Sequence, residues 1–120
     1  MKAAILIGHG SKIKGFDAPL KKVRAALSKE RKYSRISIAY LDINTPSIPA
    51  AIDAAVLSGA SEIYLLPYFL LAGKHVNLHI PHIASQARKK YAKKAKIVLC
   101  PYLGFHKKLV DVVKERLKCR

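Results

Sequence analysis

Two histidines in this 120-residue sequence lie where imidazole chemistry would be useful. His9 sits between two glycines directly after the apolar run 3–7, and His75 follows the apolar, Pro- and Gly-containing stretch 66–74. Neutral imidazole binds divalent Co, Ni, Fe and Zn ions. A histidine with an ordinary pKa of about 6.5 also exchanges a proton near neutral pH. The two residues therefore predict a site that holds a metal ion or moves protons.

The surroundings of His9 allow two other readings. Its flanking glycines let the backbone approach a ligand closely, but a histidine held by backbone hydrogen bonds in a tight turn would look the same. A phosphate loop is the second alternative, because segment 8–11 precedes a predicted helix. The sequence has neither the Gly-Lys-Ser/Thr ending of a Walker motif nor a GxGxxG pattern, which argues against nucleotide binding.

Two more histidines, His79 and His82, follow His75 at spacings of four and seven residues. On one continuous helix all three would share a face, but Pro81 argues against a helix that runs through the whole segment. We interpret His79 and His82 as surface histidines. A site with only two histidine ligands is open, and it leaves positions for water or substrate nitrogens, as a metal-transfer site requires.

Alternating strand and helix signals predict the elements that position these residues. Strands are expected over 3–7, 36–41, 62–66 and 96–100, and helices over 19–32, 47–57, 80–90 and 109–117. This βαβαβαβα order predicts a single α/β domain over 1–120, with a four-stranded parallel sheet and helices on both faces. Open α/β sheets bind ligands at the carboxyl ends of their strands, where both histidines are expected.

Composition narrows the cellular setting. Hydrophobic residues make up 51% of the chain, as in a globular protein. No apolar run approaches the roughly 20 residues that span a bilayer, and the apolar run at the N-terminus is too short for a signal peptide. Cys100 and Cys119 do not form a CxxC pair. We expect a cytoplasmic protein that does not associate with a membrane.

The charge is extreme, with 23 Lys and Arg against 7 Asp and Glu, a formal net charge of +16. Such a field attracts polyanions, although solvated helix faces would account for many of the lysines. A basic nucleic-acid-binding module is therefore one functional alternative. The chain lacks the RNP-type aromatic pattern, the helix-turn-helix signature and the zinc knuckles of such modules, so nucleic acid is a disfavoured partner.

Five segments, taken in order, resemble the small sirohydrochlorin chelatases, also called short cobaltochelatases. They are residues 6–11, 39–48, 66–76, 80–81 and 101–104. The resemblance extends over nearly the whole chain and implies a chelatase-like domain. It further implies a lyase that inserts a divalent metal into sirohydrochlorin without ATP, in cobalamin- or sirohaem-type biosynthesis. The metal substrate would be Co²⁺, with Ni²⁺ or Fe²⁺ as alternatives, and no organic cofactor is implied.

The resemblance also implies residue roles. His9 would be the proton acceptor and a metal ligand, and His75 the second metal ligand. Sirohydrochlorin would contact Thr45, Leu70, Leu71, Ala72, Gly73, Lys74 and His75. Family members of this length resemble one half of longer two-domain chelatases, which implies a homodimer.

At two positions the sequence differs from the usual pattern of the small sirohydrochlorin chelatases. Thr45 and His79 stand where family members usually carry acidic residues. Asp42 is a nearby substitute for the first acid, and His79 is a candidate third metal contact. A metal- or tetrapyrrole-binding protein without turnover is the remaining alternative.

Overall fold

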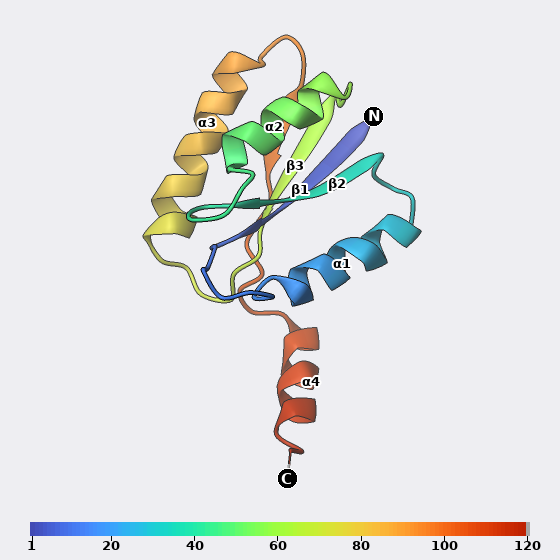
Figure 1. The fold of residues 1–120 in the computed structure, drawn as a ribbon, viewed down its shortest axis with the longest axis vertical. Helices are drawn as coiled ribbons and strands as arrows, with labels where there is room; N and C mark the ends of the chain where they lie inside the picture. The colour runs from blue at the N-terminus through green and yellow to red at the C-terminus, as the bar shows by residue number, and fades with distance from the viewer. Residues whose placement is uncertain (120) are drawn as a thin grey trace.

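One parallel sheet organises the protein in the computed structural model, which describes residues 1–119. Its strands are β1 (Lys2–Gly8), β2 (Arg35–Tyr40), β3 (Glu62–Pro67) and β4 (Lys96–Leu99), in the order β2-β1-β3-β4. The helices are α1 (Ala18–Lys29), α2 (Ile48–Leu57), α3 (Ile80–Lys90) and α4 (Lys107–Arg116), with a π-helix, η1 (His75–His79), directly before α3 (Figure 1). The predicted α/β class and βαβαβαβα order are confirmed.

Strand β1 lies at the centre of the core. Every residue of 3–7 is at most 7% exposed, as the unbroken apolar run predicted. Alternate side chains face opposite layers: Ile5 and Ile7 belong to one apolar cluster and Leu6 to another. Because β1 pairs with both β2 and β3, its register fixes the positions of both neighbours.

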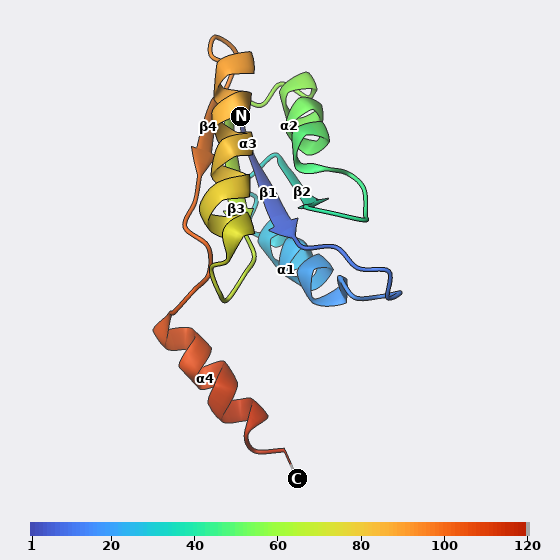
Figure 2. The ribbon, with the colours of Figure 1, turned by 90° about the vertical axis from the view of Figure 1, so that its left-hand side faces the viewer.

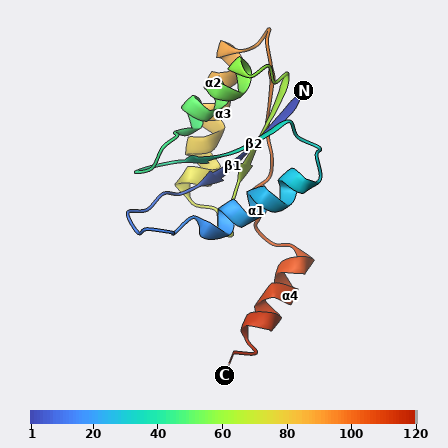
Figure 3. The same ribbon diagram turned by 45° about the vertical axis from the view of Figure 1, so that its right-hand side comes forward.

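The helices cover the two faces of the sheet unequally. Helix α1 covers one face, where Leu20 packs with Ile38 and Tyr40 of β2. Helices α2 and α3 cover the other face (Figures 1 and 3). Right-handed crossovers explain this division, because the chain moves one way across the sheet from β1 to β2 and the opposite way afterwards.

Helix α4 projects from the body of the molecule (Figure 2). None of its residues is buried, and the molecule measures 54 Å along its longest axis against 32 and 29 Å along the others. The radius of gyration is 15.1 Å, whereas a compact domain of this length has about 14 Å. The helix predicted over 109–117 thus forms, as α4, but it covers no face of the sheet. No helix within residues 1–119 is long and apolar enough to cross a membrane.

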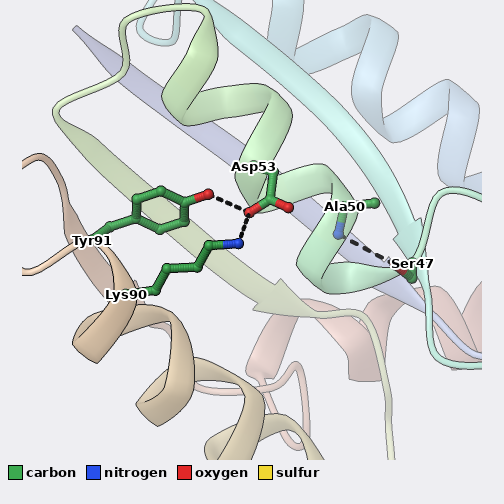
Figure 4. A network of polar contacts seen from close by, with 5 residues as sticks. All are labelled: Ser47, Ala50, Asp53, Lys90 and Tyr91. Atoms are coloured by element: carbon green, nitrogen blue, oxygen red, sulfur yellow. Dashed lines mark hydrogen bonds and ion pairs between the residues drawn. The ribbon is translucent and has the colours of Figure 1, made fainter.

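A polar cluster joins α2 to the end of α3 (Figure 4). The Tyr91 hydroxyl donates a hydrogen bond to the Asp53 carboxylate, and the Lys90 ammonium lies 3.3 Å from the same oxygen. The Tyr91 hydrogen bond holds the pKa of Asp53 below its ordinary value. Ser47 caps α2 by accepting the Ala50 N–H at 3.3 Å. These contacts orient α3, and with it the π-helix that carries His75.

The buried side chains of α2 should contribute more to the free energy of unfolding than its exposed side chains. Ile52 is fully buried and Leu57, on the same helix, is 88% exposed. We expect Ile52→Ala to lower the free energy of unfolding by about 2–5 kcal/mol, because it leaves a cavity against the sheet. Leu57→Ala should change it by less than about 0.5 kcal/mol. Urea unfolding followed by circular dichroism, at one fixed protein concentration, measures both. Equal losses in the two variants would contradict this packing.

Candidate functional site

Backbone contacts fix the position of His9. The carbonyls of Gly8 and His9 accept hydrogen bonds at 3.0 Å from the N–H groups of Leu41 and Asp42, which follow β2. Gly10 has a φ of +110°, and a Cβ at this position would lie 1.9 Å from the Asp42 carbonyl oxygen. Only glycine allows such a close approach. Gly10 therefore lets the loop after β1 pack closely against the loop after β2.

Asn44 adds a further contact between these two loops. It supplies an acceptor for a backbone N–H of the Gly-His-Gly-Ser segment that a phosphate would otherwise bind. Its side-chain Oδ1 accepts the Ser11 N–H at 2.7 Å. The Ser11 hydroxyl in turn accepts the Ile13 N–H at 3.1 Å. These two N–H groups are therefore occupied within the protein, which agrees with the absence of a nucleotide-binding motif.

His75 reaches the same edge of the sheet from β3. The Tyr68 N–H, just after β3, donates to the Ile7 carbonyl at 2.9 Å, so the two strands stay paired up to their ends. The chain then forms the exposed loop 70–74, and η1 begins at His75. His75 is half-buried, whereas His9 is exposed.

The segment from His75 to Lys90 is helical throughout, so the expectation that Pro81 separates His75 from the helix is wrong. The Ile80 N–H donates to the His75 carbonyl, an i→i−5 bond that marks a π-turn. Pro81 lies in the first turn of α3, where a missing N–H is tolerated. The wide turn thus lets a single helical segment carry His75, His79 and His82.

The two predicted histidines lie together. The ring centroids of His9 and His75 are 5.0 Å apart with planes at 77°, and the Phe69 ring flanks His9 at 6.0 Å. Metal–nitrogen bonds of about 2.0–2.1 Å place two imidazoles on one ion at a similar separation. The pair also lies beyond the carboxyl ends of β1 and β3, where the crossovers leave to opposite faces, the usual ligand position in such sheets.

Within residues 1–119, no acidic side chain completes a metal site with this pair. Among residues 1–119, no group of three or more His, Cys, Asp or Glu side chains is placed to hold a metal ion. The Asp42 carboxylate accepts the Ile43 N–H at 2.8 Å instead. His79 meets His75, with their Nδ1 atoms 3.0 Å apart, and His82 is exposed. The structure thus supports two histidines at the predicted site and gives Asp42 no place in it.

The loop predicted to contact a macrocycle is apolar and accessible. Leu70 and Leu71 are 58% and 84% exposed, and Ala72, Gly73 and Lys74 are exposed too. The sequence reasoning missed three further apolar residues near this edge that are also exposed: Ile13, Ile43 and Leu78. Their only sequence signal is that each is a large apolar residue in or next to a segment that follows a strand. Exposed apolar side chains beside the exposed Lys74 suit a ligand with a flat apolar body and a charged rim.

Thr45 lies on another part of the same edge. It lines an open cavity of about 510 Å³, together with Lys21 and Arg24 of α1. The wall of this cavity is ordered by Tyr40, whose hydroxyl donates to the Asp17 carboxylate at 2.5 Å. Burial and this hydrogen bond raise the pKa of Tyr40 to about 12, so the hydroxyl remains a donor. The cavity could accept anionic groups of a ligand.

Comparison with known proteins matches this architecture to one family. The CbiX family model matches residues 3–119. The sirohydrochlorin cobaltochelatase of Sulfolobus acidocaldarius is 32% identical over 116 residues, which cover 97% of this chain and 89% of that protein. The chloroplastic sirohydrochlorin ferrochelatase of Arabidopsis thaliana is 28% identical over 95% of this chain, and the match covers 50% of that protein.

Solved structures agree with the sequence matches. The sirohydrochlorin chelatase SirB of Bacillus subtilis subspecies spizizenii, in complex with cobalt, matches with a TM-score of 0.87 at 25% identity, over 98% of this chain and 50% of that one. A CbiX protein of Marinobacter aquaeolei matches with a TM-score of 0.76 at 25% identity, over 98% of both chains. The chain thus spans about half the length of some relatives and nearly all of others. It belongs to the CbiX family.

Proposed function

We propose that this protein is a metal-inserting lyase that places Co²⁺ into sirohydrochlorin without ATP. The observation that carries the proposal is the His9–His75 pair, with rings 5.0 Å apart at the point where β1 and β3 end. The exposed apolar loop 70–74 and the surrounding cationic groups supply the other features that a carboxylate-bearing tetrapyrrole requires. Membership of a family whose named relatives are sirohydrochlorin chelatases supports the same assignment.

The two histidines divide the chemistry. Metal insertion requires the loss of two pyrrole N–H protons and of water bound to the metal. An imidazole nitrogen that ligates a metal cannot accept a proton at the same time. In the proposed division, the half-buried His75 holds the metal and the exposed His9 accepts protons and releases them to solvent. The contact with Phe69 restricts the orientation of the His9 ring.

The substrate would lie over the carboxyl edge of the sheet. Leu70, Leu71, Ala72, Gly73 and Lys74 would contact the macrocycle, and Thr45 would contact its rim beside Lys21 and Arg24. Carboxylates on the ring would meet these cations. The formal net charge of +16 would further raise the rate of encounter with an anionic substrate.

Removal of either imidazole should greatly reduce the acceleration of sirohydrochlorin metallation over the reaction without protein. We expect His9→Ala to lower kcat/KM for sirohydrochlorin metallation by about 10²–10⁴-fold, the usual contribution of a positioned proton-transfer group. His75→Ala should also lower kcat/KM strongly, because it removes the proposed metal ligand. The absorbance change on metallation, corrected for the reaction without protein, measures this. His106→Asn is a matched control, because the His106 ring bonds the Lys108 N–H at the start of α4 and asparagine can also cap that helix. Unchanged rates in both alanine variants would contradict the proposal, and binding of sirohydrochlorin without any rate gain would favour a non-catalytic binding protein.

Cobalt is the proposed metal substrate. The Sulfolobus relative is named a cobaltochelatase and the Arabidopsis relative a ferrochelatase, and two solved relatives contain cobalt and Fe³⁺. Imidazole sites bind Ni²⁺ more tightly than Co²⁺, and Co²⁺ more tightly than Fe²⁺, so binding strength alone does not set the choice. We expect the highest kcat/KM with Co²⁺ when each ion is supplied at the same buffered free concentration under anaerobic conditions. A higher value with Fe²⁺ or Ni²⁺ would overturn this assignment of the metal and leave the chelatase activity intact.

We also propose that two copies of the chain associate through α4. Val110, Val113 and Leu117 lie at i, i+3 and i+7 and are 40%, 55% and 76% exposed, so one side of the helix is apolar and uncovered. Phe105, just before the helix, is 81% exposed. An apolar stripe on a projecting helix is typical of an interface. The SirB structure that matches this chain so well is about twice as long, which supports a two-lobed assembly.

The proposed dimer can be tested through the oligomeric state of the protein in solution. Sedimentation velocity should give a dimer at micromolar concentration for the wild type, and Val113→Lys should shift it to monomer by placing a charge in the interface. Glu115→Lys adds the same side chain to the same helix, away from the apolar stripe, and should leave the dimer intact. A wild type that stays monomeric throughout the micromolar range would contradict the proposal.

A further inference from the structure

His79 makes a direct polar contact with the proposed metal ligand His75. Their Nδ1 atoms are 3.0 Å apart, their ring planes differ by 14°, and their ring centroids are 5.1 Å apart. The centroids are thus farther apart than the nitrogens by nearly two imidazole ring radii. Both nitrogens must therefore lie between the centroids, close to the line that joins them, and the rings meet edge to edge.

This geometry is that of an N–H···N hydrogen bond. Two imidazoles that share a metal ion through Nδ1 turn both lone pairs toward a third point, away from the line that joins the two nitrogens. In the observed arrangement each Nδ1 faces the other, so one donates a single proton and the other accepts it. His79 is therefore placed as a partner of His75 and not as a third metal ligand.

The role proposed for His75 selects which of the two rings donates. His75 is half-buried beside His9, and His79 is exposed. If His75 donates from Nδ1, its Nε2 keeps a free lone pair for the site, and the Nε2–H of His79 is hydrated. If His79 donates instead, His75 carries its proton on Nε2 and has no free lone pair there. Metal-binding histidines usually donate their second N–H to a fixed acceptor.

We propose that His79 is a positioning residue that holds His75 in the Nδ1–H tautomer and so keeps Nε2 ready for the metal substrate. The inference rests on the proposed function for the identity of that substrate, but the tautomer itself is a property of the free protein. The backbone supports the pairing, because the π-turn that joins the two residues is closed by the Ile80 N–H, and Ile80 is fully buried. His79 thus does here what a carboxylate or carbonyl does behind other metal-binding histidines.

The first test reads the tautomer without any metal. In ¹⁵N-labelled protein, well above the ordinary histidine pKa of about 6.5, the imidazole nitrogen shifts distinguish a protonated from an unprotonated Nδ1. The wild type should show His75 protonated at Nδ1 and His79 protonated at Nε2. His75 protonated at Nε2 would overturn the proposal.

The second test separates the hydrogen bond from packing. His79→Leu removes the acceptor and should raise the Kd for Co²⁺, titrated into the protein alone, by about 10-fold, with His75 losing its Nδ1–H preference. His79→Asn supplies a neutral carbonyl acceptor close to the position of Nδ1 and should restore both the affinity and the tautomer. His106→Asn should leave both unchanged.

Two results would overturn the inference: an unchanged Kd and tautomer in His79→Leu, or a loss in His79→Asn as large as in His79→Leu. If His79→Leu does not fold, the wild-type tautomer and His79→Asn still decide. Failure of the proposed function has a different signature, because the wild type would then bind Co²⁺ with the expected tautomer and yet give no metallation of sirohydrochlorin.

Discussion

The parallel pairing of β1 with β3 is the constraint on which the site depends. Ile7 lies opposite Pro67, and the Tyr68 N–H still donates to the Ile7 carbonyl where both strands end. The chain leaves β1 toward one face of the sheet and β3 toward the other, so the two following loops diverge from adjacent points. That divergence opens the carboxyl edge, and the pairing holds His9 and His75 on either side of it. A shift in this register would separate the two imidazoles without changing any residue of the site.

The loops that follow β1 and β3 differ in how firmly the rest of the protein holds them. The loop after β1 is held by backbone hydrogen bonds and by the contact of Gly10 with the Asp42 carbonyl, so the position of His9 is defined before any ligand arrives. The loop 70–74 after β3 is exposed along its whole length. If His9 is the proton acceptor, as proposed, its fixed position opposite an accessible apolar loop would suit a large, flat substrate, because the histidine keeps its geometry while the ring binds.

Much of this could be predicted from sequence, because the relevant signals are local. The apolar run 3–7 identified the central strand, and the position of each histidine after a strand predicted that the two would meet. The π-turn could not be predicted in the same way. It depends on an i→i−5 bond made by Ile80, and the rule that proline interrupts helices pointed away from it. From the sequence, His79 was interpreted as a surface histidine or a third metal contact, and its hydrogen bond with His75 was missed. The last helix was likewise predicted from the sequence, but its position away from the sheet was not, because a helix signal carries no information about the surface that covers the helix.

Acidic side chains are scarce in this chain, and most of those that the structure pairs are engaged away from the histidines. Three of the seven carboxylates accept tyrosine hydrogen bonds, which lower their pKa values and keep them ionised as acceptors. The pairs are Asp17–Tyr40, Asp53–Tyr91 and Glu62–Tyr64. A fourth acid, Asp42, is occupied by a backbone N–H, and Thr45 contributes no charge. In the proposed function, imidazole would serve as the proton acceptor at His9 and as the hydrogen-bond partner of His75 at His79, without reducing the positive field that an anionic substrate would meet.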